Sequence, residues 1–328
     1  MPDNPKVSVV LCTYNGEKHH LREQLDSILR QTYPLHEIIV QDDHSTDGTL
    51  AILHEYAARC PYIKVQTNQG AQGVNPNFFS AMRSASGDLI AISDQDDLWE
   101  ATKIAEQVAA IGDKLLCACR SEPFVEGGVA VQFDRRLPNF NLIRALYAST
   151  AGHCMLIRRE LLDKLPGDCV LYHRTCYDVI LALTAAAYDS MVLIDRILVH
   201  QRRYAGATTF SDYDKRRVRS SSNALHIVLE GLRRYREVKP YMREHFSVRL
   251  DFLRRLSADT PIYADGLRVL EAESTKGLCA LLRLTRLYVK YRHVVFYTYE
   301  KDPSALVRAL LHPFMQVYNY SYLADKRK

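Results

Sequence analysis

The sequence lacks the motifs that would place it at once in several large enzyme classes. It has no GxxxxGK[ST] phosphate loop, and no GxGxxG follows its first predicted strand, which excludes P-loop and dinucleotide-binding proteins. HExxH and GxSxG are also absent, so zinc protease and α/β-hydrolase chemistry is not expected. No run of about 18 uncharged apolar residues occurs, and we therefore predict no membrane-spanning helix.

The eight cysteines form no CxxC pair, and their spacing is irregular. Most lie in apolar stretches, which favours reduced, buried thiols in a cytosolic protein over a disulfide framework. Residues 1–6 contain two prolines and no apolar segment, so no secretory signal is expected there. The 328 residues are 47% hydrophobic and 25% charged, which is typical of a globular protein with about two domains.

The net charge of +5 is unevenly distributed along the chain. Residues 1–214 carry 20 Lys/Arg and 27 Asp/Glu, a net charge of −7. Residues 215–328 carry 23 Lys/Arg and 11 Asp/Glu, a net charge of +12. This asymmetry predicts two parts, an acidic domain at 1–214 and a basic region at 215–328. Helical spacing of apolar residues makes the second part mostly helical, with helices expected at 278–299 and 305–317.

In the first hundred residues, short β-branched runs alternate with segments of helical periodicity. The predicted strands are Val7–Cys12, Glu37–Val40, Ile63–Gln66 and Leu89–Ile92. This order is typical of a parallel α/β sheet with right-handed crossovers. Residues 115–210 have a mixed pattern, with one clear helix predicted at 176–188. Open α/β sheets bind ligands at the carboxyl ends of their strands, so side chains there are the first functional candidates.

Three carboxylates, Asp94, Asp96 and Asp97, come directly after the fourth predicted strand. Oxygen ligands of this kind suit Mg²⁺ or Mn²⁺, which commonly bridge a carboxylate to a substrate diphosphate. The alternative is a solvated acidic turn that caps the helix beginning near Glu100.

Two further positions have both a functional and a structural interpretation. Asp42 and Asp43 follow the second strand, where they can accept hydrogen bonds from a nucleotide base or ribose, or simply shape the turn and helix start that follow. Asp178 stands at the front of an apolar helical run, as a catalytic carboxylate or as a helix cap favoured by the dipole.

Taken together, these segments resemble glycosyltransferase family 2, inverting enzymes of the GT-A fold. The resemblance covers about residues 5–210, and the form SDQDDLW resembles bacterial rhamnosyltransferase-like members that build O-antigen or capsule polysaccharide. The matching segments are VSVVLCTYNGEKHHLREQLDSILRQTYP (7–34), EIIVQDDHSTDGT (37–49), the stretch holding Asn68, Gly73 and Asn77, GDLIAISDQDDLW (87–99), GHCMLIRREL (152–161) and Asp178. The implied fold is a Rossmann-like nucleotide-binding sheet with a mixed acceptor-side half.

The resemblance also implies roles for individual residues. Asp178 takes the place of the general base, and Asp96, with Asp97 beside it, takes that of the metal ligand bridging to the diphosphate. The acceptor-side wall is expected to contain Trp99, Gly152 and His153. The residues implied to bind the nucleotide sugar are Thr13, Tyr14, Glu17, Asp42, Asp43, Asn77, Asp94 and Asp96.

The sequence departs from the family pattern at two places. Tyr177-Asp178 replaces an acidic pair or His-Asp but keeps the last carboxylate. Tyr204 stands where many members have a metal-binding histidine, and His200 would supply one only in another register. Arg202 and Arg203 are candidates for phosphate contact or for a plain surface patch, and we expect a closing loop near Arg202–Thr209.

The implied reaction moves a sugar from a UDP- or dTDP-sugar, dTDP-rhamnose among them, to an acceptor hydroxyl of a glycan or lipid-linked glycan, with Mg²⁺ or Mn²⁺ as cofactor. The alternative is a degenerate, non-catalytic protein that holds a sugar nucleotide or scaffolds an assembly. No nucleic-acid motif is present.

A basic stripe of Arg283, Arg286, Lys290 and His293 lies beside apolar residues at helical spacing. Such a helix either rests on an anionic membrane or packs on the catalytic domain with a solvated face. The first interpretation places the protein at the inner face of the plasma membrane, and the second in the cytoplasm.

Overall fold

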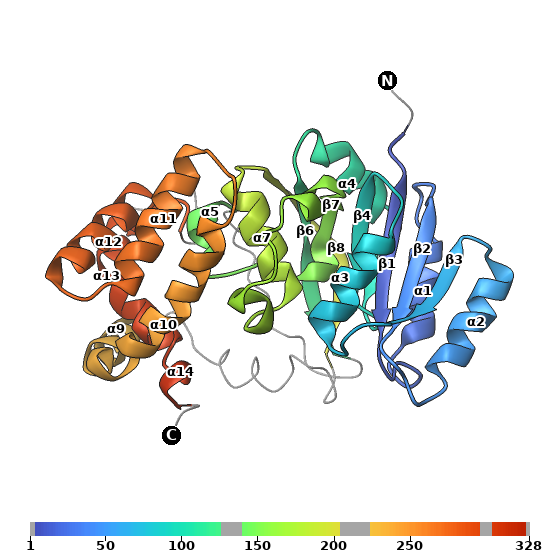
Figure 1. Ribbon diagram of the computed structural model, residues 1–328, viewed down its shortest axis with the longest axis horizontal. Helices are drawn as coiled ribbons and strands as arrows, with labels where there is room; N and C mark the ends of the chain where they lie inside the picture. The colour runs from blue at the N-terminus through green and yellow to red at the C-terminus, as the bar shows by residue number, and fades with distance from the viewer. Residues whose placement is uncertain (1–3, 126–139, 204–223, 296–303, 326–328) are drawn as a thin grey trace.

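The computed structural model describes residues 4–125, 140–203, 224–295 and 304–325 (Figure 1). A curled sheet flanked by helices forms one end of the molecule, and a bundle of helices forms the other. The long helix α7 (Tyr177–Ala187) lies between these two parts.

One eight-stranded sheet, in the order β3-β2-β1-β4-β7-β6-β8-β5, supports the first part of the chain. Strands β3, β2, β1 and β4 are mutually parallel, which confirms the predicted α/β unit. Beyond β4 the sheet is mixed, because β7 runs antiparallel to both β4 and β6. The strands are β1 (Val7–Thr13), β2 (Glu37–Asp42), β3 (Ile63–Thr67), β4 (Leu89–Ser93), β5 (Leu98–Trp99), β6 (Leu116–Phe124), β7 (Met155–Arg158) and β8 (Met191–Arg202).

Alternating side chains of the central strands feed two separate apolar cores. On β1, Val7, Val9 and Leu11 face one core, and Val10 and Cys12 face the other. The first core is covered by α1 (Leu21–Leu29), α2 (Thr49–Arg59) and α4 (Lys103–Ile111). The second is covered by α3 (Val74–Ser84), α5 (Leu142–Ala145) and α7, and it continues into the helical bundle. Shorter elements are η1 (Gly152–Cys154), α6 (Glu160–Asp163) and η2 (Val170–His173).

The predicted helical character of the basic region is confirmed in its described part. Its helices are α9 (Ala224–Arg233), α10 (Tyr235–Arg254), α11 (Pro261–Ser274), α12 (Leu278–Lys290), α13 (Ala305–Asn319) and α14 (Tyr322–Asp325). The helix expected at 278–299 was placed too long, since α12 ends at Lys290 and a turn follows. The predicted boundary at 214/215 lies outside the described residues. None of the described helices is long and apolar enough to cross a membrane.

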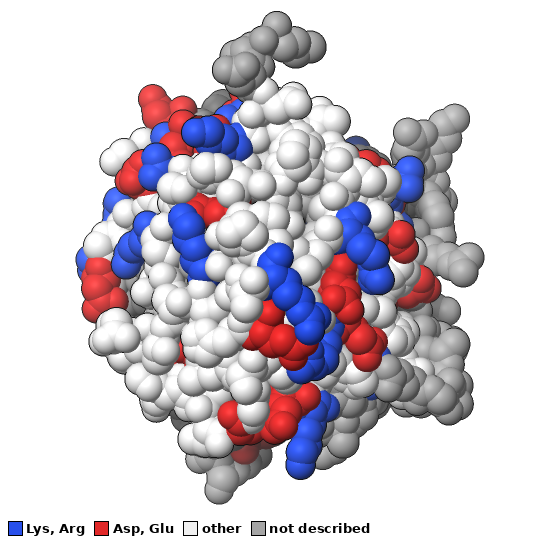
Figure 2. All heavy atoms as spheres, turned by 90° about the vertical axis from the view of Figure 1, so that its right-hand side faces the viewer, with Lys and Arg blue, Asp and Glu red and all other residues white. Residues whose placement is uncertain are grey.

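The expected burial of the cysteines and the expected acidity of residues 1–214 are only partly seen in the structure. All eight thiols are free, and five are buried, but Cys176 and Cys279 are exposed. Figure 2 shows the end of the molecule formed by β3 and α2, where basic and acidic side chains are intermingled. The acidic excess of residues 1–214 therefore does not gather into a single patch on this face.

A buried polar network joins the helical bundle to the sheet domain. Glu273 of α11, fully buried, is ion-paired with Lys239 of α10. Its Oε1 also accepts hydrogen bonds from the hydroxyls of Tyr147 (3.1 Å) and Tyr288 (2.9 Å). Tyr147 follows α5, so three helices of the bundle and a segment of the sheet domain share one carboxylate. A buried carboxylate with three donors is costly to break, because its partners lose their compensation together.

We predict that Glu273→Ala lowers the free energy of unfolding by about 3–5 kcal/mol, the cost of leaving a buried charge without its partner. The matched control is Glu271→Ala on the same helix. Glu271 and its partner Arg254 have side chains 40% and 57% exposed, so their pair is worth less than about 1 kcal/mol. Chemical denaturation monitored by circular dichroism measures both. Equal losses in the two variants would contradict the role of the network.

Candidate active site

The carboxyl end of β4 brings together the side chains that dominate the site. The buried strand Leu89–Ser93 ends at the acidic turn, and η1 arrives beside it from a distant part of the chain. Ligand atoms of Asp94, Asp97 and His153 all lie within 4.8 Å of one another. Nδ1 of His153 is 3.1 Å from Oδ2 of Asp94 and 3.0 Å from Oδ2 of Asp97. The side chain of Asp94 is 40% exposed, so one side of this cluster is open.

Two buried atoms of the cluster are left without a hydrogen bond. They are Oδ2 of Asp97, which approaches His153 without hydrogen-bonding geometry, and Nε2 of His153. Buried polar atoms are normally satisfied, so orphaned ones call for an explanation such as an ion. Two carboxylates and one imidazole also form an acceptable donor set for Mg²⁺ or Mn²⁺. The residues present therefore fit a divalent cation.

The electrostatics of the cluster point the same way. The pKa of Asp97 is raised to about 7, mainly by burial and also by the charges of Asp94 and Asp96, and His153 opposes this rise. Burial alone would lower the pKa of His153, but the Asp97 and Asp94 carboxylates raise it to about 9. A proton is thus retained between Asp97 and His153 because negative charge is in excess. A bound cation would relieve the same excess.

Asp96 occupies a different position from Asp97. Its side chain is partly exposed, and it does not belong to the Asp94–Asp97–His153 cluster, although it was predicted as the bridging ligand with Asp97. The loop that carries it is held by Arg202, which is 3% exposed. Arg202 donates from its backbone N to Oδ1 of Asp97 (3.2 Å) and from Nε to the carbonyl oxygen of Asp96 (3.2 Å). Arg202 therefore shapes the acidic loop from within and is no surface patch.

The two carboxylates at the end of β2, Asp42 and Asp43, differ in how many hydrogen bonds they already accept. Asp42 is fully buried and accepts hydrogen bonds from Oγ1 of Thr13 and from both N and Oγ of Ser45. Asp43 is 8% exposed and accepts one hydrogen bond on each oxygen, from Asn68 and from the backbone N of Gly73. A carboxylate oxygen has room for two donors, so Asp43 is better placed than Asp42 to accept from a bound base.

The other residues expected around the nucleotide differ in how much surface they offer. Tyr14 is 58% exposed at the same edge, and its backbone is held by the side chain of Gln95. Glu17 accepts from the backbone N of Gly48 and so fixes the turn before α2. Asn77 is 4% exposed and exchanges hydrogen bonds with Gln41 of β2. Tyr14 is thus open to a ligand, whereas Glu17 and Asn77 support the loops around it.

Asp178 lies in the first turn of α7, and its neighbour Tyr177 anchors that turn. The Tyr177 ring stacks on Phe78 of α3, with centroids 4.0 Å apart. It also covers Gly152, where an added Cβ would lie 2.0 Å from the Tyr177 hydroxyl oxygen. Glycine is required at 152 because the ring takes the space of a side chain. These contacts fix the start of α7 beside η1 and the acidic cluster.

The environment of Asp178 changes its acidity. Burial raises the pKa of its carboxyl to about 6, and the charge of Asp94 adds to the effect. The influence of Asp94 and His153 on this group places it within electrostatic reach of the cluster. A raised pKa beside other carboxylates is typical of a catalytic group, although structural groups show it too.

Two predicted site residues have other partners in the structure. Trp99 is 5% exposed and belongs to the core covered by α1, α2 and α4. Nζ of the buried Lys103 lies 3.8 Å from the centroid of the Trp99 ring. His200 is paired with Glu100 at 2.7 Å rather than with the acidic cluster. The histidine of the cluster is His153, which the sequence assigned only to the acceptor wall. Tyr204 and the rest of the expected loop lie outside the described residues.

Comparison with known proteins supports the assignment of the fold and family. The family model described as Glycosyl transferase family 2 matches residues 8–166. The Escherichia coli protein named UDP-Glc:alpha-D-GlcNAc-diphosphoundecaprenol beta-1,3-glucosyltransferase WfgD is 36% identical over 107 residues, covering 33% of this chain and 41% of that one. The chain thus spans about two fifths of the length of such curated relatives.

Solved structures match nearly the whole chain at low identity. S. aureus TarS 1–349, crystallised with UDP-GlcNAc, aligns with a TM-score of 0.56 and 18% identity, covering 97% of this chain and 91% of that one. The mannosyltransferase PcManGT from Pyrobaculum calidifontis, in complex with GDP-Man and Mn²⁺, gives a TM-score of 0.54 at 18% identity, covering 99% and 87%. The family 2 motifs and the matched family model place a glycosyltransferase family 2 domain at residues 8–166, and the sheet has the GT-A fold.

Proposed function

We propose that this protein is an inverting glycosyltransferase that moves a sugar from a UDP- or dTDP-sugar to an acceptor hydroxyl during cell-surface polysaccharide synthesis. The observation that carries the proposal is the Asp94–Asp97–His153 cluster at the carboxyl end of β4, with Asp178 at the start of α7 within electrostatic reach of Asp94 and His153. A nucleotide site and a base beside it are the two parts that such a reaction needs.

In this mechanism, Asp178 accepts the proton of the attacking acceptor hydroxyl. Its raised pKa brings it closer to neutrality, which makes it a better base than an ordinary carboxylate. Asp43 and Tyr14 orient the nucleotide base, and Arg202 holds the acidic loop in place. Asp94, Asp97 and His153, with Asp96 turned toward them, would hold a divalent cation. When bound, that cation supplies positive charge that stabilises the leaving diphosphate.

The acceptor and the donor sugar are proposed from relatives and not from the site itself. The printed name of WfgD describes a glucosyltransferase acting on a diphosphoundecaprenol-linked sugar. A lipid-linked glycan is therefore a reasonable acceptor class here, and dTDP-rhamnose remains a donor to be screened with UDP-sugars. The competing function is a degenerate sugar-nucleotide-binding scaffold. Metal-dependent hydrolysis of a donor by the purified protein would exclude that scaffold.

We also propose that the basic region holds the enzyme peripherally at an anionic membrane. The stripe predicted from the sequence is only partly available for this, because Lys290 is ion-paired with Asp265 of α11. Arg283 and Arg286 remain exposed on α12.

The first prediction for the candidate site concerns the divalent cation. We expect Asp97→Asn and His153→Gln each to weaken the Mn²⁺-dependent binding of UDP by about 10–100-fold or more, because each removes a donor from the cluster. Asp96→Asn should weaken it as well if Asp96 turns to the diphosphate as the sequence predicts. Calorimetry of UDP binding with and without Mn²⁺ measures this. The control is Asp113→Asn, an exposed carboxylate on the turn before β6. Unchanged metal enhancement in the Asp97 and His153 variants would overturn the ligand set.

The second prediction concerns the base. Asp178→Asn is isosteric and should reduce sugar transfer by roughly 10²–10⁴-fold while leaving the affinity for UDP and Mn²⁺ nearly intact. Initial rates with the true acceptor, or with a soluble glycan screen, measure the first effect and calorimetry the second. Transfer at the wild-type rate would refute the role of Asp178, and Glu160 and Asp195 would then be the next carboxylates to test.

The third prediction tests the environment of Asp178 without any activity. Its folded pKa of about 6 lies above the unfolded value near 3.9, so the ionised form is disfavoured by folding. The resulting loss of stability is absent below pH 4, grows as the pH rises, and is complete above pH 6. Asp178→Asn removes the charge and should be more stable than wild type by about 1–3 kcal/mol at pH 7.5, but not at pH 4. Denaturation in EDTA at both pH values provides the comparison, and a pH-independent difference would contradict the burial.

A further inference from the structure

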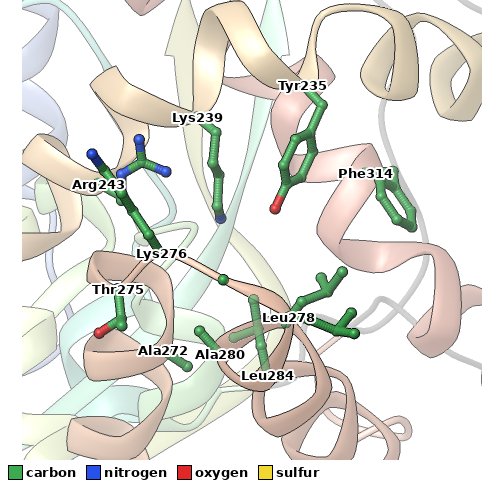
Figure 3. A pocket seen from close by; sticks show the side chains of 12 residues that line it. Tyr235, Lys239, Arg243, Ala272, Thr275, Lys276, Leu278, Ala280, Leu284 and Phe314 are labelled. Carbon is green, nitrogen blue, oxygen red and sulfur yellow. The ribbon is translucent and has the colours of Figure 1, made fainter.

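A cavity of about 310 Å³ opens in the helical bundle, away from the candidate active site (Figure 3). It lies where α10, the turn between α11 and α12, and α13 meet. In Figure 3 the side chains of Tyr235 and Lys239 extend from α10 toward the cavity, with Phe314 on the side of α13 and Leu278 opposite. No step of the proposed transfer reaction uses these residues.

The polar lining of the cavity is basic. Lys239, Arg243 and Lys276 all contribute to it, and no acidic residue does. Lys239 is ion-paired with Glu273 in the buried network. Arg243 is partly exposed and Lys276 is exposed, and no acidic partner is found for either among the residues that the structure describes. Two cations at the mouth of a cavity, unbalanced by a carboxylate, complement an anionic group.

The backbone adds to this positive potential. α12 is 13 residues long and begins at the cavity, after Gly277 with φ of 106°. Its first N–H groups have no partner within the helix, and its dipole is positive at this end. Lys276 and Leu278, on either side of Gly277, both line the cavity. The polar wall thus suits a phosphate group in both charge and hydrogen-bonding capacity.

The helices α12 and α13, which border the cavity, and α9, which packs on α13, carry exposed apolar side chains. Eight of the twelve exposed large hydrophobic side chains in the described residues lie on α9, α12 and α13, namely Leu225, Leu229, Leu232, Leu278, Leu282, Leu306, Val307 and Leu310. Leu278 is 69% exposed although it lines the cavity, and Leu282 follows it one turn later. On α13, Val307 and Leu310 precede the cavity residue Phe314 at helical spacing, on the same side of the helix. Gly231 of α9 packs against the Phe314 carbonyl, which brings the third helix alongside.

We propose that this cavity binds the phosphate headgroup of an anionic phospholipid while the surrounding leucines enter the membrane interface. The proposal rests on the peripheral membrane contact proposed above and assigns that contact to a specific site. A cationic cavity with the exposed Leu278 in its wall and further exposed leucines on the neighbouring helices matches a lipid, whose charged headgroup and apolar chains are neighbours. A second copy of this chain would bring the same cations together, since a symmetric contact pairs like surfaces. The net charge of +12 on residues 215–328 adds long-range attraction to an anionic surface.

This site differs from the stripe expected from the sequence. With about 100° per residue, the cavity-lining positions Leu281 and Leu284 lie roughly on the opposite side of α12 from Arg283 and Arg286, and Leu278 and Leu282 lie between the two sets. The cavity cations Arg243 and Lys276 can therefore be changed separately from Arg283 and Arg286. Reversing the charge of each pair gives two variants with the same change in net charge.

The test is co-sedimentation of the full chain with phosphatidylglycerol vesicles, with phosphatidylcholine vesicles as the neutral comparison. Wild type should bind the anionic vesicles at low salt and be released at high salt. Arg243→Glu with Lys276→Glu should weaken binding about tenfold or more, and Leu278→Gln with Leu282→Gln should also weaken it. Arg283→Glu with Arg286→Glu, the same change in charge outside the cavity, should retain most of the binding. Mn²⁺-dependent UDP binding and an unchanged unfolding transition verify that each variant is folded.

The outcomes separate the cavity from the wider membrane proposal. If wild type does not bind anionic vesicles at low salt, both the cavity proposal and the membrane-contact proposal are refuted. If wild type binds but the cavity variant binds equally well, or if the stripe variant alone loses binding, the cavity proposal is overturned and the membrane contact stands. Equal binding to phosphatidylcholine would show apolar attachment without headgroup recognition and would also overturn it. Light scattering tests whether a second copy of the chain covers this surface instead. If wild type is a dimer, and the Leu278/Leu282 variant is a monomer that still binds vesicles, the surface is a dimer interface and the cavity proposal is overturned.

Discussion

The crowding of negative charge at the end of β4 is the constraint on which the site depends. Asp94, Asp96 and Asp97 follow one another on a loop that is partly buried, and Asp178 lies within their field. Such groups repel one another, and the low-dielectric surroundings strengthen that repulsion. His153 opposes it with its imidazole, and Arg202 holds the loop by hydrogen bonds to Oδ1 of Asp97 and to the carbonyl oxygen of Asp96. The loop is thus held in a state that a cation would stabilise further.

The opposing charges come from segments far apart in sequence. His153 is brought by η1 and β7, which insert between β4 and β6, and Arg202 stands at the end of β8. Arg202 also reaches Glu23 of α1 at 2.6 Å, so the acidic loop, the last strand and the first helix are fixed by one guanidinium. The mixed half of the sheet therefore does more than form a wall, since it supplies the imidazole of His153 and the Arg202 hydrogen bonds that hold the acidic loop of the parallel half.

The local features of the fold were predictable from the sequence, and the long-range contacts of the site were not. β-branched runs and helical periodicity identified the four parallel strands, and the acidic residues after strand ends indicated the sheet edge at which the candidate site lies. Local sequence pattern does not show that His153 contacts Asp94, 59 positions earlier in the chain. His153 was therefore assigned to the acceptor wall and not to the acidic cluster. Burial explains the other differences. Trp99 was expected beside an acceptor, and its ring lies in a core. Asp42 was expected to bind a base, and its buried carboxylate accepts three hydrogen bonds from Thr13 and Ser45.

The helical bundle was expected as a separate basic region, but its packing makes it part of the site's support. Its core is continuous with the one that covers β1 and β4, so no solvent layer separates it from the sheet. Glu273 of the bundle holds Tyr147, and the chain passes from Tyr147 to Gly152 and His153 within six residues. Tyr177 then presses on Gly152 from α7, which itself contacts α10 and α11. The imidazole that balances the acidic loop, and the carboxylate proposed as base, are therefore both positioned on segments anchored to the bundle. A contact between the bundle and a membrane would then act on a body whose core is continuous with that of the sheet, so the orientation of the bundle on a surface would set the direction in which the candidate site opens.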